Sequence, residues 1–458
     1  MEHKEILREL IEEMDAANSS DRPWTKEEGI PEFVTAANGR QRFFTLPTRR
    51  ALTRFTVALY ENRRSESAKM ELQSFEKIVR QVIADMHASD LFCGVDWYES
   101  LQRVKREVDD RCAKIQSVFT HYISAWTLGF EKLKAFSLGP VTFLSQLDWI
   151  DQVEFSDRAK ESYLNEKEAN YQWKKILKEA LSDRNRDVEL SGLAGAVYDV
   201  VTQCPTLLKV TIQGYDLEFS RKLAKMVCRS ALDMISLGLG APEFFLQQAL
   251  HEERLPPVGN DRIVETNGYL WLPGSDLGRR IPVMSPKRAS EALTKISDLL
   301  PAFSSILDGL VTPQLHKHPK LASRWATALD WYAEGNREMS DAIALTKLGT
   351  CLDVLSSGGK NEGIRQMVVN LTGLTEAKTV VSGLRPRTLK ELIKDIYDHG
   401  RSKILHGTHH DRLQSFSDER KYAAYLARIA LIECALRLHT FTGDDNNDKA
   451  FRTIAPAI

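Results

Sequence analysis

The chain has 458 residues, of which 43% are hydrophobic and 27% are charged, and its formal net charge is −1. This is the composition of an ordinary globular protein, and at ~100–200 residues per domain the length predicts two or three folding units. A net charge so close to zero argues against a protein that coats duplex nucleic acid over its whole surface, so any contact with nucleic acid must be local.

The spacing of the cysteines and the length of the apolar runs indicate in which cellular compartment the protein is expected. No cysteine forms a C-x-x-C pair, which argues against a zinc knuckle or a disulfide framework. No uninterrupted apolar run reaches the ~18 residues that a membrane-spanning helix needs. Residues 1–5 lead into an amphipathic helix instead of the apolar core of a signal peptide. The sequence therefore predicts a soluble, cytoplasmic protein that makes no contact with a membrane.

The amino-terminal half has mainly helical periodicity. Residues 1–16 place Ile6, Leu10, Ile11 and Met14 on one face, which predicts a short charged helix. A polar loop is expected to about residue 44, followed by long helices over 47–128. Helical patterning returns at about 156–184 and 213–239.

Two segments, at residues 136–154 and around residues 267–268, are expected to form extended structure. The Gly139-Pro140 break is followed by β-branched and aromatic residues, so segment 136–154 is expected to hold a short strand or an extended connector. Asn267-Gly268 stands between two runs of strand-forming residues, which predicts a β-hairpin.

Pro301 is expected to divide the helical pattern of 290–310 into two helices.

The carboxyl-terminal third reads as a compact helical bundle that begins after a boundary near 313–318. Thr388 and Glu391 have the spacing of a capping box and predict the start of one helix. The remaining helices are expected at 321–335, 340–355, 363–371 and 415–440. Short loops between such helices favour antiparallel packing.

These elements predict a mainly α protein in three parts. Residues 1–239 would form a multi-helix region, and residues 240–315 a loop-rich segment with a small β-hairpin and a connecting helix. Residues 316–458 would form the helical bundle.

One stretch of the bundle has the residues for chemistry on RNA: Gly400-Arg401-Ser402-Lys403-Ile404-Leu405-His406-Gly407. Histidine suits proton transfer near neutral pH, and the planar guanidinium of arginine can hold two phosphate oxygens. Together they could catalyse attack of a ribose 2′-hydroxyl on the adjacent phosphate without a metal or another cofactor.

The spacing of this pair sets a geometric condition. Positions five apart on a helix are offset by ~140°, so Arg401 and His406 would not face one another on a regular helix. Both can act at one phosphate only through a local distortion, or if two chains each supply a pair. Gly400 and Gly407 bracket the motif and would permit irregular backbone.

The stretch resembles the R-x4-6-H signature of HEPN-domain ribonucleases, over about residues 316–445. The resemblance implies a dimeric helical bundle whose two motifs share one cleft, with Arg401 and His406 as catalytic residues and Ser402 as the polar residue that follows the arginine. It also implies a supporting acid, which we carry to Asp353. The family more often has glutamate there, and Asp341 or Glu334 could serve instead.

The layout of a long amino-terminal region before such a module is similar to that of ApeA-like proteins of bacterial anti-phage defence. This implies RNA as the substrate, a phage-derived trigger, and a sensing or regulatory role for residues 1–239. Lys403, His409 and His410 would then help to hold RNA.

Three other interpretations compete with this one. Arg401 and His406 could cap helix ends and pair with Asp398 or Asp411 on the surface. The bundle could be a dimerisation or RNA-binding unit without activity. The local cluster of His399, His406, His409 and His410 could instead bind a metal ion, although no carboxylate or cysteine stands at a standard ligand spacing nearby.

Overall fold

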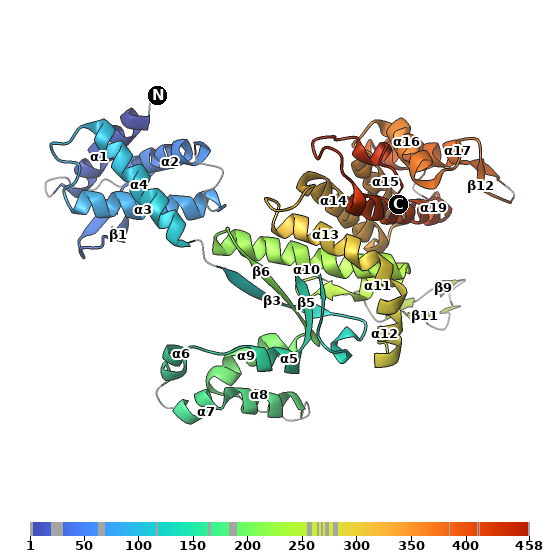
Figure 1. Cartoon of the computed structure of the whole chain (residues 1–458), viewed down its shortest axis with the longest axis horizontal. Helices are drawn as coiled ribbons and strands as arrows, with labels where there is room; N and C mark the ends of the chain where they lie inside the picture. The colour runs from blue at the N-terminus through green and yellow to red at the C-terminus, as the bar shows by residue number, and fades with distance from the viewer. Residues whose placement is uncertain are drawn as a thin grey trace. The chain divides into compact units, whose positions relative to one another are not determined.

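The computed structural model in Figure 1 is mostly helical, with a small amount of sheet. It describes residues 3–19, 31–62, 69–115, 118–163, 166–182, 190–253, 283–383, 385–409, 411 and 413–456, and the backbone of four short strands between 259 and 277. Within these residues no helix is long and apolar enough to cross a membrane.

The internal contacts group the chain into two compact units. Unit 1 comprises Met1–Thr120 and Thr211–Ala224, and unit 2 comprises His121–Val210 and Lys225–Ile458. This grouping differs from the three segments expected from the sequence, because chain segments distant in sequence fold together.

In its described residues, unit 1 contains four complete helices, a β-hairpin and the start of a further helix, α10 (Leu217–Leu239). The helices are α1 (His3–Asn18), α2 (Leu46–Glu61), α3 (Leu72–Ala88) and α4 (Trp97–Ile115). Strands β1 (Glu32–Thr35) and β2 (Gln41–Phe44) pair antiparallel, with Glu32 opposite Phe44. The expectation of a loop up to about residue 44 is therefore wrong in its described part. Gly39 has a φ of +82°, which lets the chain turn between two segments rich in strand-forming residues.

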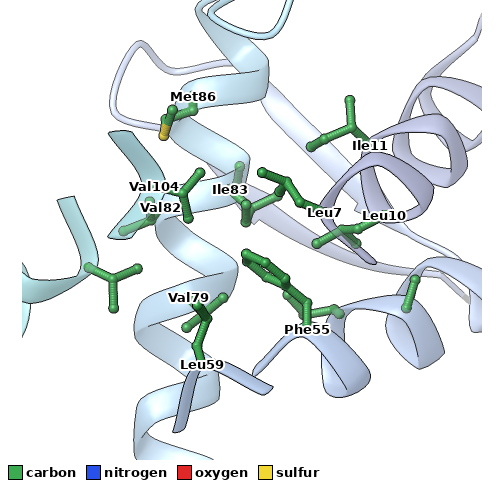
Figure 2. Packing of buried hydrophobic residues seen from close by; sticks show 14 of the residues in the cluster. Leu7, Leu10, Ile11, Phe55, Leu59, Val79, Val82, Ile83, Met86 and Val104 are labelled. Atoms are coloured by element: carbon green, nitrogen blue, oxygen red, sulfur yellow. The ribbon is translucent and has the colours of Figure 1, made fainter. Parts of the chain in front are cut away.

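The core of unit 1 lies between its helices (Figure 2). Leu7 and Leu10 of α1 meet Phe55 of α2 and Val79 and Ile83 of α3, and all five are fully buried. The helix expected over residues 1–16 is confirmed, because its predicted apolar face is the one that packs into this core.

Unit 2 contains most of a five-stranded sheet with the order β4-β5-β6-β3-β7. Its strands are β3 (Phe119–Trp126), β4 (Phe136–Leu138), β5 (Val141–Ser145), β6 (Thr206–Ile212) and β7 (Ala249–Leu250). Strands β4 and β5 confirm the extended structure expected around Gly139-Pro140, and β5 pairs antiparallel with β6. The helical expectation is wrong over β3, whose β-branched and aromatic residues suit a pleated surface.

A helical insertion connects β5 to β6. It comprises α5 (Gln146–Gln152), α6 (Asp157–Glu161), α7 (Lys167–Tyr171), α8 (Trp173–Ser182) and α9 (Gly192–Thr202). Trp149, Trp173 and Leu177 lie in its small core. The Trp173 indole N–H donates a 2.9 Å hydrogen bond to the Glu154 carboxylate, and Lys160 and Lys174 lie within ion-pair distance of the same group.

The middle of unit 2 leads from the sheet to the bundle. It contains α10 (Leu217–Leu239), which begins in unit 1, and then α11 (Pro242–Gln247), α12 (Pro286–Lys295), the short 3-10 helix η4 (Ser297–Leu299) and α13 (Leu300–Val311). Pro301 lies in the first turn of α13, so the expected division into two helices is confirmed.

The β-hairpin expected around Asn267-Gly268 is confirmed in its strands. Strand β9 (Glu265–Thr266) pairs antiparallel with β10 (Tyr269–Leu270), and β8 (Gly259–Arg262) pairs with β11 (Gly274–Leu277). The two turn residues themselves lie outside the described residues.

The carboxyl-terminal bundle has its helices where the sequence placed them. They are α14 (Pro319–Arg337), α15 (Asp341–Leu355), α16 (Lys360–Thr372), α17 (Leu389–Lys394), the π-helix η5 (Asp395–Ser402), α18 (Lys403–Leu405), α19 (Ser417–Thr440) and the 3-10 helix η6 (Ala450–Arg452). Strands β12 (Thr379–Val381) and β13 (Arg387–Thr388) form a small antiparallel pair that the sequence did not reveal. Helices α14 and α19 run antiparallel, since the Trp325 indole donates to Leu431 while Arg420 donates to Gly335.

The hydrogen bonds around Glu154 predict a pH dependence of stability. The hydrogen bond from Trp173, together with Lys174, the Phe155 amide and Lys160, lowers the pKa of Glu154 from 4.5 to about 2. A carboxylate with a lowered pKa stabilises the folded state above its unfolded pKa, and that stabilisation is lost as the pH falls through the folded value.

We therefore expect the stability difference between wild type and Glu154→Gln to shrink between about pH 4.5 and about pH 2. Urea unfolding at a series of pH values, followed by tryptophan fluorescence, measures this difference. Glu161→Gln changes an exposed carboxylate of the same insertion and serves as the control. A pH-independent difference for Glu154→Gln would contradict the assignment.

Candidate active site

The chain reaches the Arg401–His406 stretch through an irregular helix. The capping box at Thr388 is present in full, with the Thr388 side chain accepting from the Glu391 amide and the Glu391 carboxylate accepting from the Thr388 amide. Helix α17 then passes directly into the π-helix η5, which ends at Ser402. A π-helix widens the turn by one residue and often occurs at functional sites. The π-helix is a local distortion of the kind that the spacing of Arg401 and His406 requires, although it ends at Ser402, before His406.

Two glycines allow this π-helix to lie close to α15. A Cβ atom on Gly400 would lie 2.6 Å from a methyl carbon of Leu345. A Cβ atom on Gly349 of α15 would lie 3.0 Å from the Cβ atom of Arg401. Side chains at either position would push the two helices apart, so these glycines set the distance between α15 and the motif.

Arg401 is half-buried and held by two partners. Its Nη2 atom lies 3.2 Å from Oδ2 of Asp353, and its Nη1 atom donates a 3.1 Å hydrogen bond to the Tyr397 hydroxyl. The guanidinium carbon also lies 5.0 Å from the centroid of the Tyr397 ring. These contacts fix the orientation of the guanidinium from both sides.

Of the three acids considered from the sequence, Asp353 is the one that meets Arg401. Asp341 pairs with Arg420 instead. Glu334 pairs with Arg229, Arg337 and Lys347.

The Asp353–Arg401 pair retains unused hydrogen-bonding capacity. Among the described residues, the buried Nε of Arg401 and the buried Oδ1 of Asp353 have no hydrogen-bond partner. Burial raises the pKa of Asp353, and the positive charges of Arg401 and Arg452 oppose that rise. Burial also raises the pKa of Tyr397, and the nearby Asp353 charge adds to the effect. The cluster therefore contains one N–H donor and one carboxylate oxygen that are not paired with another group.

Arg452 belongs to the surroundings of this cluster, and sequence reasoning missed it. From η6 it donates hydrogen bonds to the carbonyls of Ser356 (2.7 Å) and Gly358 (2.9 Å), which close the end of α15 just after Asp353. Nothing in the sequence near Arg452 signals this contact, because it joins residues almost a hundred positions apart.

His406 has a different environment from Arg401. It is exposed at the end of α18, where Gly407 follows with a φ of +65°. No described residue hydrogen-bonds its ring, which is exposed to solvent. In the described residues, the Arg401 and His406 side chains share no hydrogen bond, and Asp353 and Tyr397 are the partners of Arg401.

The other predicted residues lie around the motif. Ser402 is half-buried and Lys403 is exposed. The His409 ring bonds to the Asp411 carbonyl at 2.6 Å and packs edge-on against Phe416, and His410 lies outside the described residues.

The competing interpretations find limited support in the geometry. Arg401 does not pair with Asp398, which instead accepts a hydrogen bond from Asn361. His406 does end a short helix, as the structural interpretation expected. In the part of the chain that the structure describes, no three histidine, cysteine, aspartate or glutamate side chains gather as a metal site would require.

Comparisons with protein-family models, with curated proteins and with solved structures find no match to this chain. The functional assignment therefore depends on the geometry of the site and on the motif.

The close packing at Gly400 predicts a specific pair of mutational effects. Gly400→Ala should lower the free energy of unfolding by about 1–3 kcal/mol, because the added methyl group overpacks against Leu345. In a Leu345→Ala background this penalty should largely disappear, since the opposing methyl groups are gone.

The measurement is urea unfolding of wild type, both single variants and the double variant. Additive losses in the double variant would show that Gly400 is not held against Leu345.

Proposed function

We propose that this protein is a metal-independent endoribonuclease of the HEPN type. The observation that carries the proposal is the arginine that Asp353 and Tyr397 hold in place, five residues before an exposed histidine with no partner among the described residues. This arrangement provides a fixed positive charge for a phosphate and an exposed imidazole that can donate or accept a proton.

The reaction that fits these groups is intramolecular transesterification of RNA. The ribose 2′-oxygen loses its proton and attacks the adjacent phosphorus, the bond from phosphorus to the 5′-oxygen breaks, and that oxygen takes up a proton. His406 transfers the proton, and Arg401 offsets the negative charge that builds on the phosphate oxygens. The products end in a 2′,3′-cyclic phosphate and a 5′-hydroxyl.

Arg401 is suited to its role because its orientation is fixed before RNA binds. Asp353 and Tyr397 act on it as positioning residues. Ser402 and Lys403 follow on the same helical stretch, where Lys403 is exposed to approaching RNA.

The five-residue spacing of Arg401 and His406, with no hydrogen bond between them in the described chain, is compatible with a site shared by two copies of the chain. Exposed apolar side chains flank the motif, with Leu405 57% exposed and Leu413 96% exposed. Such side chains are suited to burial at an interface. We propose that a homodimer brings two motifs to one groove.

The biological setting follows only from the resemblance. We propose that the nuclease acts in the cytoplasm in anti-phage defence by abortive infection, with a phage-derived trigger sensed by the amino-terminal region.

Removal of His406 provides the direct test. His406→Ala should reduce the cleavage of total RNA by about 10²–10⁴-fold, because proton transfer contributes that much to such reactions. Arg401→Ala should also abolish cleavage, and the wild type should keep its activity in EDTA. End-group analysis of the products reports the 2′,3′-cyclic phosphate.

His439→Ala is the matched control, because it removes an exposed histidine of the same bundle outside the motif. Cleavage that survives His406→Ala, or that needs a divalent metal ion, would refute the proposal. RNA binding and dimerisation without any cleavage would favour the non-catalytic alternative.

A further inference from the structure

Unit 1 has an open hollow that is rich in arginine. Its volume is about 720 Å³, and it lies between β1, α2 and α3. The lining residues are Glu32, Leu46, Arg49, Arg50, Thr53, Arg54, Glu76 and Arg80. The lining has four arginines and two glutamates, and Arg54 also pairs with Glu9, so one positive charge remains without a matching carboxylate.

Two of these arginines converge on a single carboxylate. Nη1 of Arg49 lies 2.8 Å from one oxygen of Glu32, and Nη1 of Arg80 lies 2.6 Å from the other. Two guanidinium groups that each hold one oxygen of the same anion form a clamp that also fits a phosphate group.

The arginines have more donors than their partners can use. Arg80 also bonds to Glu76 at 3.0 Å, yet the Nε atoms of Arg49 and Arg80 are both buried without an acceptor among the described residues. A phosphate brings more acceptor oxygens than a carboxylate, and a small rotation of either side chain would present these donors to it.

The rim of the hollow adds two further features that favour an anion. Arg50 is exposed and has no partner in the described part of the chain. Leu46, which lines the hollow, is the first residue of α2, a helix of 16 residues. The positive end of the α2 dipole therefore lies at the edge of the hollow.

We propose that this hollow binds a compact polyphosphate, in competition with the Glu32 carboxylate. The lining contains no aromatic side chain on which a base could stack, so the phosphate groups themselves are what the site recognises. The Glu32 side chain is 45% exposed, which leaves it free to give up its place in the clamp. This site is independent of the nuclease proposed for unit 2.

Because the Glu32 carboxylate and the polyphosphate compete for the same arginines, removing the Glu32 charge should strengthen binding of the polyphosphate. Glu32→Gln removes the charge that occupies the clamp, so it should tighten polyphosphate binding by about two- to fivefold. A purely structural network would not bind the ligand in either form.

The probe is inorganic tripolyphosphate, titrated calorimetrically into the full-length protein in EDTA at low salt. We expect saturable binding, and Arg50→Glu should weaken it by at least about tenfold because it replaces an attraction with a repulsion. Arg50 holds no other described group, so this variant should fold normally. Arg103→Glu is the matched control, since it reverses an exposed charge on α4 of the same unit outside the hollow.

Two further probes separate the ligand classes. ATP should bind about as tightly as tripolyphosphate if the phosphate chain alone is recognised. A preference for ATP or for a short RNA of at least about tenfold would overturn the assignment to a compact polyphosphate. The absence of saturable tripolyphosphate binding, or equal binding by Arg50→Glu and Arg103→Glu, would overturn the site itself.

Discussion

The geometry of the candidate active site depends on how closely the π-helix approaches α15. Gly400 and Gly349 have no side chains at this contact, and a Cβ atom at either position would lie 3.0 Å or less from a side-chain atom of the other helix. This close approach brings Asp353 within ion-pair distance of Arg401 and places Tyr397 beside the guanidinium. The widened turn then leaves His406 at the exposed end of α18, outside the packed interface.

The arginine–carboxylate contacts at Asp353 and at Glu32 differ in how far the carboxylate side chain is exposed to solvent. The side chains of Arg401 and Asp353 are 22% and 17% exposed, so that pair is protected and can hold the guanidinium in one orientation. Glu32 is 45% exposed between Arg49 and Arg80, so water and dissolved anions can compete for the same donors. The first pair is suited to positioning and the second to exchange.

Local sequence patterns failed mainly at the strands of the two units. Strand β3 follows directly on a long helical stretch and was expected to continue it, although it pairs within a sheet. Strands β5 and β6 pair across an insertion of five helices, and no window of neighbouring residues contains both partners. The hairpin β1-β2 was missed because its polar, glycine-containing surroundings resemble a loop.

Local sequence patterns predicted the helices of the bundle, the capping box at Thr388 and the break at Pro301, and they required either irregular backbone around Arg401 or a second chain. These features depend on hydrogen bonds and dihedral preferences within a few residues, which a short window contains. The contact of Asp353 with Arg401, the closure of the end of α15 by Arg452, and the convergence of Arg49 and Arg80 on Glu32 appear only in the folded chain. Each of these contacts joins residues separated by 17 positions or more, so it depends on the path of the chain through the packed core.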